Sequence, residues 1–258
     1  MTDEAAPGET LDGFFGRRVL LRQFRRGHRA GLDAALLAAA APAAFSGLAL
    51  DVGAGSGAVG LALAATRPGA RVGLIECDPA SAALARENIA LNGLGARVQA
   101  HEADALAPRA RRAAGLKDEA ADLVLSNPPF LDPARARASP DADRRRAHMA
   151  PDGGAARWTV ACLALARPGG DVMLIDRPER LGGFLAALEG RAGAAVLKPV
   201  YPRAGAAAIR VLLRARKGAR TPLAIAPGLV LHDDEGGFTR EAQALLAGED
   251  ALAWGDAR

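Results

Sequence analysis

The sequence is poor in the residues that build disulfide frameworks, metal centres and membrane spans. It has two cysteines, Cys77 and Cys162, far apart, and four histidines that stand singly, so it offers no metal-ligand spacing. The longest apolar run, near residues 34–44, is rich in alanine and interrupted by proline, unlike a membrane span. The first ten residues are acidic and small, unlike a signal peptide. We therefore expect a cytoplasmic protein with no metal and no membrane partner.

Aromatic residues are also scarce. They make up 4% of the chain although half of it is apolar, so alanine and leucine must fill most of the core. A chain of 258 residues can bury such a core and favours one domain with short appendages. We expect a disordered tail at residues 1–12, a domain at 13–220, and a tail at 221–258 that packs on the domain. Nothing in the sequence implies an oligomer.

Acidic residues are missing from two long stretches, residues 13–32 and 191–231, which we call the first and second basic segments. The net charge is +4, and the basic residues of both segments are mostly arginines. Acidic residues concentrate in the middle of the chain. Two basic segments that flank an acidic middle favour a polyanionic substrate. The alternative is that the coding bias of a GC-rich genome enriched arginine on solvated faces.

Strand and helix patterns alternate through the centre of the chain. We expect a short hairpin at residues 14–21, a loop over the site at 132–153, and a final antiparallel pair at 194–200 and 207–214. Between these the apolar spacing predicts strands at 48–52, 71–76, 97–100, 121–126 and 171–176 and helices at 34–44, 58–66, 79–91, 155–166 and 178–188. A strand, glycine turn, helix and second strand in succession form a parallel βαβ unit, so we expect an α/β fold.

Two prolines end the fourth of these strands. The corner consists of Asn127, Pro128, Pro129 and Phe130, and each proline fixes its own φ and biases the residue before it toward extended backbone. The carbonyls of Asn127 and Pro128 and the Asn127 amide oxygen stay available as acceptors beside an aromatic face. This set suits a planar nucleophile with an N–H2 group. The corner resembles the catalytic motif of amino-methylating, S-adenosylmethionine-dependent methyltransferases; the alternative is a plain proline-terminated strand.

A glycine-rich turn follows the first strand of the βαβ unit and includes Asp51, Gly53, Ala54, Gly55 and Gly57. Glycines let a ligand approach the backbone and supply positive φ. Residues 55–60 also fit the dinucleotide pattern G-x-G-x-x-G, with an acid about twenty residues on. The end of the strand argues against a dinucleotide site. Because Val52 is the last residue of the strand, Gly53 is the first glycine of the turn. The turn then reads Gly-x-Gly-x-Gly, in which the third glycine is spaced differently from that of G-x-G-x-x-G. An acid before the turn also suits a cationic methionine end, so we favour S-adenosylmethionine over a dinucleotide.

Two further acids follow the next two strands. Glu76 can accept hydrogen bonds from both ribose hydroxyls, and Asp104 can accept from the adenine N6 amine while the Ala105 N–H donates to a ring nitrogen. Cys77 is expected to pack under the adenine as a small apolar residue. These acids fall at the carboxyl ends of parallel strands, where open α/β sheets bind ligands. The alternatives are a surface acid at position 76 and a helix N-cap at position 104.

With these residues placed, the chain is similar to the bacterial tRNA1(Val) (adenine-37-N6)-methyltransferase family of class I methyltransferases. The resemblance rests on residues 27–33, 51–57, 76, 104, 127–130 and the apolar tail at 229–232. It implies a doubly wound, Rossmann-like, mostly parallel sheet of seven strands with the last strand antiparallel. It also implies that Asp33 or Arg29 lies near the methionine end of the cofactor; the alternative role of Asp33, which the sequence favours, is to cap the helix that follows it. Some relatives have tyrosine at the position of Phe130, so a phenol hydrogen bond is lost while stacking remains.

We therefore expect an S-adenosylmethionine-dependent N-methyltransferase that acts on the exocyclic amine of an RNA base, adenine N6 in tRNA. Asn127 and Pro128 would hold the N–H2 group, Phe130 would stack a flipped base, and arginines would hold phosphates. The alternatives are a guanine-N2 methyltransferase of rRNA, a protein-glutamine N-methyltransferase of a release factor, and a non-catalytic cofactor-binding scaffold. No feature of the sequence accounts for recognition of a tRNA anticodon.

Overall fold

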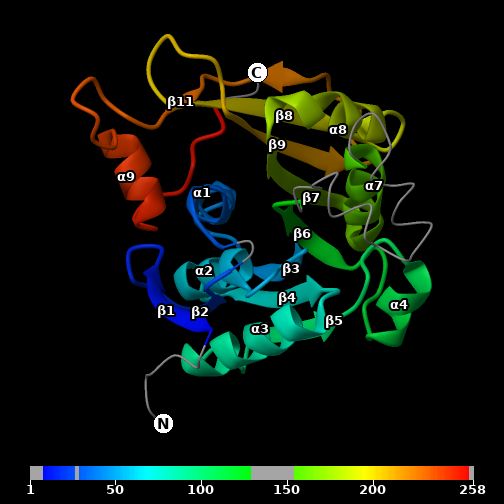
Figure 1. Ribbon diagram of the computed structural model, residues 1–258. Coiled ribbons are helices and arrows are strands. Elements are labelled where there is room, and N and C mark those ends of the chain that lie inside the picture. The colour runs from blue at the N-terminus through cyan, green and yellow to red at the C-terminus, as the bar shows by residue number, and fades with distance from the viewer. Residues whose placement is uncertain (1–7, 27–28, 129–153, 256–258) are drawn as a thin grey trace.

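The computed structural model describes residues 8–26, 29–128 and 154–255, which form a nine-stranded sheet, a separate two-stranded hairpin and helices on both faces of the sheet (Figure 1). The residues 129–153, which include Pro129, Phe130 and the expected loop over the site, lie outside the described residues. Among the described residues, no helix is long and apolar enough to cross a membrane.

Seven long strands carry the sheet, and their order is β5-β4-β3-β6-β7-β9-β8. Strands β3 to β7 run parallel, whereas β9 is antiparallel to both β7 and β8. Their bounds are β3 Gly47–Val52, β4 Ala70–Glu76, β5 Val98–Glu102, β6 Ala121–Ser126, β7 Ala166–Asp176, β8 Ala192–Tyr201 and β9 Arg210–Lys217. This arrangement confirms the doubly wound sheet of seven strands with the last one antiparallel.

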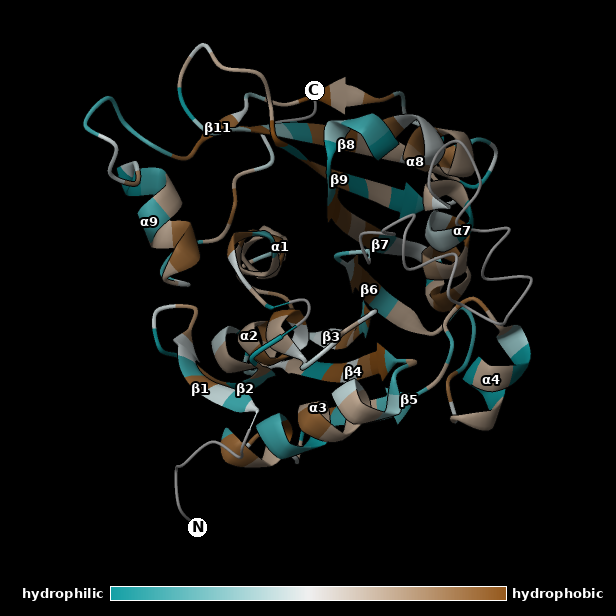
Figure 2. Cartoon of the chain, in the orientation of Figure 1, coloured by the Kyte–Doolittle hydropathy of each residue, from teal (hydrophilic) through white to brown (hydrophobic). Residues whose placement is uncertain are grey.

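Helices cover both faces because successive strand residues point to opposite sides. In β6, Leu123 and Leu125 belong to the core beneath α1 (Leu32–Ala40), α2 (Ala58–Thr66) and α3 (Pro79–Leu91). Val124 belongs to the second core, beneath α7 (Ala155–Leu165) and α8 (Leu181–Leu188), and the 3-10 turn η1 (Pro178–Arg180) precedes α8. The short α4 (Pro108–Ala113) lies in the crossover between β5 and β6. Figure 2 shows the apolar colours concentrated on the central strands and on α1.

Local signals set the helix ends as expected in α3 but not in α1. Asp78 caps α3 by accepting from the Ser81 N–H at 2.9 Å, with Pro79 in its first turn, and Asn92 ends the helix. Helix α1 begins after Gly31 and has no side-chain cap, so Asp33 lies in its first turn and is not the N-cap.

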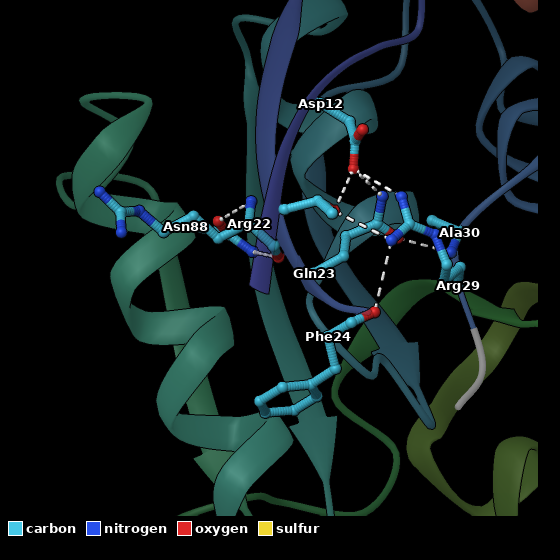
Figure 3. Close-up of polar contacts among 8 residues, drawn as sticks. Asp12, Arg22, Gln23, Phe24, Arg29, Ala30 and Asn88 are labelled. Atoms are coloured by element: carbon cyan, nitrogen blue, oxygen red, sulfur yellow. Dashed lines mark hydrogen bonds and ion pairs between the residues drawn. The ribbon is translucent and has the colours of Figure 1, made fainter. Parts of the chain in front are cut away.

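The N-terminal hairpin differs from the prediction. The sequence predicts disorder over residues 1–12, but β1 (Glu9–Phe14) pairs along its full length with β2 (Val19–Phe24), so residues 9–12 are ordered. Residues 1–7 lie outside the described residues. The hairpin rests on α3, because Asn92 and Asn88 exchange side-chain hydrogen bonds with the backbone of Leu20 and Arg22. Figure 3 shows the pair that Asn88 forms with Arg22. These partners are 66 and 72 positions apart, so no local sequence pattern predicts the hydrogen bonds between them.

The C-terminal residues return to the sheet and then to α1. Short strands β10 (Ala224–Ile225) and β11 (Leu229–Val230) both pair with β8 in parallel. Helix α9 (Arg240–Leu246) then packs beside α1 (Figure 1). The Leu252 N–H donates to the Ala39 carbonyl at 2.8 Å, and the Trp254 indole donates to the Ala40 carbonyl at 2.9 Å. The division into a domain at 13–220 and a tail beyond it remains a prediction.

Candidate active site

A cavity of about 500 Å³ opens at the carboxyl ends of β3, β4, β5 and β6. This volume lies in the range of small-molecule sites. The residues that the sequence predicts to bind a cofactor line it, except Asp33 and Gly57; those that do are Asp51, Gly53, Ala54, Gly55, Glu76, Cys77, Asp104, Ala105 and Asn127. They meet because parallel neighbouring strands end at one edge of the sheet.

The glycine turn is held by backbone geometry that needs glycine. Gly53, Gly55 and Gly57 have φ of 74°, 55° and 92°, a region that L-residues with a Cβ rarely adopt. The Gly53 and Ala54 N–H groups both donate to the Ile75 carbonyl, which fixes the turn on β4. A Cβ on Gly55 would meet no atom within 4 Å, whereas one on Gly57 would lie 2.8 Å from Leu74 Cδ1. Gly57 therefore starts α2 and permits close packing.

Glu76 is oriented by three backbone N–H groups. Its Oε2 accepts from Gly55 at 2.8 Å, and its Oε1 accepts from Cys77 at 2.7 Å and Asp78 at 2.8 Å. With two lone pairs on each oxygen, Oε1 is fully used and Oε2 keeps one acceptor site for a further donor. The carboxylate is thus fixed before any ligand arrives, at the place where the sequence predicts contact with a ribose.

Asp51 is buried beneath the same turn. It is only 1% exposed, and its Oδ2 accepts from the Gly60 N–H at 3.0 Å. Burial raises the pKa of Asp51 to about 7, the nearby Glu76 charge adds to this rise, and the Gly60 bond opposes it. A cation placed beside Asp51 would favour its charged form.

Asp104 and Ala105 form the turn after β5. The Asp104 Oδ1 accepts from the Leu106 N–H at 2.9 Å, which makes a local turn. Helix α4 begins at Pro108 with Ala107 as its N-cap, so Asp104 does not cap it. Among the described residues, the Ala105 N–H makes no hydrogen bond. A free acceptor oxygen and a free N–H therefore stand side by side at the cavity.

Asn127 lies at the end of β6 with its Oδ1 buried and without a hydrogen-bond partner among the described residues. A buried polar atom without a partner costs about 1–3 kcal/mol, so such an atom in a native site requires an explanation. Pro128 beside it is buried, while Pro129 and Phe130 lie outside the described residues. The orphaned acceptor is the chemical feature that a donor N–H on a ligand would satisfy.

Trp158, which the sequence analysis did not single out, also lines the cavity. Its indole Nε1 donates to the Ser126 Oγ at 2.8 Å, and that hydroxyl donates to the Val52 carbonyl at 2.6 Å. The first turn of α7 is thereby tied to the ends of β6 and β3. The sequence feature that could have pointed to Trp158 is the rarity of tryptophan, because the chain has only two.

The hairpin supplies a second wall that the sequence did not predict. Gln23, Phe24 and Arg26 line the cavity. The buried Gln23 amide accepts from the Ala30 N–H at 2.7 Å and donates to Asp12 at 3.2 Å (Figure 3). Arg29 binds Asp12 at 2.7 Å and Thr10 at 2.9 Å, so it faces the hairpin and does not line the cavity.

Asp33 also points to another partner. It accepts from Arg210, at the start of β9, at 2.8 Å, and it is not among the residues that line the cavity. Asp176, at the end of β7, lies fully buried 2.9 Å from Arg180. Burial raises the pKa of Asp176, and the Arg180 charge opposes that rise.

The second basic segment does not form a continuous rim around the cavity. Because β9 runs antiparallel to β8, Arg203 and Arg210 lie at the carboxyl edge, while Arg216 and Lys217 lie at the opposite edge. There Arg216 pairs with Asp171 at 3.0 Å and Lys217 with Glu119 at 2.9 Å. The distal half of the second basic segment therefore lies away from the cavity.

Residues 29–142 match the family model of the methyltransferase small domain. The chain is also 31% identical over 183 residues to the tRNA1(Val) (adenine(37)-N6)-methyltransferase of Cronobacter sakazakii, a match that covers 70% of this chain and 71% of that protein. This chain belongs to the S-adenosylmethionine-dependent methyltransferases. Over shorter matches, the methyltransferase is 35% identical to the Serratia proteamaculans enzyme of the same name, covering 47% of this chain and 45% of that protein. It is 39% identical to a release factor glutamine methyltransferase of Synechocystis, covering 41% and 34%.

Solved structures agree on the fold. A protein from Agrobacterium tumefaciens, described as a predicted O-methyltransferase, is 31% identical and superposes with a TM-score of 0.73, covering 86% of this chain and 98% of that one. TYW2 of M. jannaschii, solved in complex with AdoMet, superposes with a TM-score of 0.55 at 15% identity, covering 84% of this chain and 88% of that one. At that identity the likeness shows the fold alone.

Proposed function

We propose that the methyltransferase methylates the exocyclic amine of an RNA base, adenine N6 in tRNA, with S-adenosylmethionine bound in the 500 Å³ cavity. The observation that carries the proposal is that Asn127 lines that cavity and that its buried Oδ1 has no partner among the described residues. S-adenosylmethionine supplies a methyl group that its sulfonium has already activated. The protein then has mainly to orient the acceptor and exclude water.

The cavity residues fit this cofactor one by one. Glu76, held by three N–H groups, would accept from a ribose hydroxyl through its Oε2. Asp104 and the Ala105 N–H would bind the amine and a ring nitrogen of adenine, and Cys77 would pack against the ring. Asp51 would lie toward the cationic methionine end. Supporting this assignment, the fold is shared with TYW2, which was solved with AdoMet.

The corner at Asn127 favours a nitrogen acceptor. The Asn127 amide oxygen and the Pro128 carbonyl would accept from the two N–H bonds of a planar amine, which turns the nitrogen lone pair toward the methyl donor and stabilises the positive charge that grows on nitrogen. An oxygen acceptor would need its single proton removed, and an amide oxygen is too weak a base for that. The corner therefore disfavours the oxygen chemistry that the name of the Agrobacterium protein suggests.

Two observations support RNA as the bearer of that amine. The first is that relatives matched over 183 and 197 residues are named for tRNA adenine methylation. The second is that two exposed arginines, Arg25 after β2 and Arg203 after β8, lie next to the cavity wall or at the carboxyl edge of the sheet. Arginines there would bind phosphates and make affinity depend on salt. A tRNA substrate would place the enzyme in the cytoplasm.

A protein-glutamine acceptor is the second candidate, because the release factor enzyme of Synechocystis is 39% identical over 107 residues. A glutamine side chain is also planar and ends in N–H2, so the corner at Asn127 would hold it equally well. The two candidates differ in the molecule that carries the methylated nitrogen, which is RNA in one case and a protein in the other. Only the RNA substrate needs contacts to phosphates.

The test is methyl transfer from labelled S-adenosylmethionine to total tRNA, total rRNA and purified release factor, followed by nucleoside and amino-acid analysis. We expect N6-methyladenosine in tRNA, and loss of label with Asn127→Ala. Label in rRNA guanine or in glutamine, with none in tRNA, would replace the substrate assignment. Equal labelling by wild type and Asn127→Ala would remove the assigned role of the corner.

A further inference from the structure

Charge is distributed unevenly among the groups that line the cavity. The described lining residues include four carboxylates, Asp51, Glu76, Asp78 and Asp104, and a single cation, Arg26. The methionine end of S-adenosylmethionine carries an ammonium, a sulfonium and a carboxylate. Asp51 suits the cationic groups, but the four acids together repel the carboxylate. That carboxylate therefore needs a donor that the acids cannot provide.

The hairpin holds Arg26 on the wall of the cavity. Arg22 and Gln23 precede Arg26 in the chain, and both are held in place. The Asn88 side chain binds the backbone of Arg22, and the Gln23 side chain accepts from the Ala30 N–H (Figure 3). The Asn88 amide also donates to the Ser56 carbonyl at 2.9 Å. One side chain thus joins the hairpin to the glycine turn, so Arg26 follows a segment whose position relative to the cavity is set.

The arginines next to Arg26 do not share this position. Arg25 is exposed and is not among the lining residues, and Arg29 is paired with Asp12 at 2.7 Å. The Arg26 guanidinium has no carboxylate or carbonyl partner within the part of the chain that the structure describes. Of the first basic segment, it is the cation that both faces the cavity and is available to a ligand.

We propose that Arg26 binds the α-carboxylate at the methionine end of the cofactor. This inference rests on the proposed function, since it takes S-adenosylmethionine as the occupant of the cavity. A guanidinium pairs with a carboxylate through two parallel N–H bonds, which gives orientation as well as affinity. Arg26 is then a residue of the cofactor site, and it is distinct from the arginines that hold RNA phosphates.

The experiment compares two ligands that differ in the amino-acid part alone. S-adenosylhomocysteine carries the carboxylate, and 5′-methylthioadenosine lacks it. Calorimetry on the full chain should show that Arg26→Ala weakens S-adenosylhomocysteine binding about tenfold, which corresponds to about 1.4 kcal/mol, and leaves methylthioadenosine binding unchanged. Arg25→Ala, the matched neighbour, should change neither. Arg26→Lys keeps the positive charge but loses the pair of parallel N–H donors, so it should retain more affinity than Arg26→Ala and less than the wild type.

Three other outcomes would overturn the proposal in different ways. Equal weakening of both ligands would make Arg26 a structural part of the wall. Unchanged S-adenosylhomocysteine affinity in Arg26→Ala would assign the carboxylate to other donors, such as the first-turn N–H groups of α2. Failure of wild-type protein to bind either ligand would refute the cofactor assignment itself, which separates that failure from a failure at Arg26. Circular dichroism of each variant checks that it is folded.

Discussion

The Glu76 carboxylate accepts a hydrogen bond from the Gly55 N–H at 2.8 Å. This bond joins the end of β4 to the glycine turn that follows β3, so two neighbouring strand ends are coupled through a group that also faces the cavity. Because the carboxylate is already oriented, little of its rotational freedom is lost when a ligand binds, and such preorganisation favours affinity.

The first prediction concerns this carboxylate. Glu76→Ala should weaken S-adenosylhomocysteine binding tenfold or more, a loss of about 1.4 kcal/mol, measured by calorimetry. Glu102→Ala is the matched control, because Glu102 stands opposite Glu76 in the register of β4 and β5 but does not line the cavity. NAD should not bind to the wild type. Unchanged affinity in Glu76→Ala, or binding of NAD, would contradict the assignment.

The second prediction separates the corner from the cofactor site. Asn127→Ala should lower kcat by roughly 10²–10³, as for loss of one oriented transition-state partner, and leave cofactor affinity within a few-fold. Single-turnover methylation of tRNA measures the first quantity and calorimetry the second. If turnover stays near the wild-type rate, the corner is only the end of a strand.

The third prediction is a pH dependence caused by Asp51. Its pKa is raised from 3.8 to about 7 by burial, so the folded protein keeps this proton to a higher pH than the unfolded chain does. The contribution of Asp51 to the free energy of unfolding should therefore fall as pH rises from about 4 to about 7, and stay constant above that. Urea unfolding at several pH values should show this fall in the wild type, and a smaller one in Asp51→Asn. Equal pH profiles for the two proteins would contradict the prediction; Asp176, whose pKa is also raised, contributes equally to both.

The fourth prediction tests the tie between Trp158 and Ser126. In a Trp254→Phe background, Trp158 is the remaining tryptophan, and S-adenosylhomocysteine should change its fluorescence because it lines the cavity. Ser126 is fully buried and does not line the cavity, so Ser126→Ala should leave the shape of the site intact but free the indole. We expect greater quenching of Trp158 by acrylamide in that variant and a several-fold lower kcat/KM. If S-adenosylhomocysteine does not change the fluorescence of Trp158, then Trp158 lies outside the cofactor site.

The fifth prediction uses the split of the second basic segment. Arg203 follows β8 at the carboxyl edge, whereas Arg220 follows β9 at the other edge, and both are exposed. Arg203→Glu should raise KM for tRNA several-fold and reduce the salt dependence of binding, while Arg220→Glu should change neither. Arg210 is unsuitable for this test because reversing it would break its pair with Asp33. Equal effects of the two reversals would mean that the carboxyl edge has no special role in holding RNA.

The sequence by itself determined the alternation of strands and helices and the residues at the strand ends. Apolar spacing is a local property, and Asp78, Pro79 and Asn92 set the ends of α3 through neighbours a few positions away. Once the strands are parallel, their carboxyl ends must share an edge. For that reason Asp51, Glu76, Asp104 and Asn127 could be predicted to meet, and all four line one cavity.

Tertiary structure alone decided which polar groups meet across long stretches of chain. Asn88 and Asn92 bind a hairpin 66 and 72 positions away, and Asp33 pairs with Arg210 at a separation of 177 positions. Polar side chains of this kind have no periodic signal, because their partners depend on the register and packing of whole elements. The same cause placed Arg26 on the cavity wall and sent the distal arginines of the second basic segment to the opposite edge, since one antiparallel strand reverses the direction of the chain.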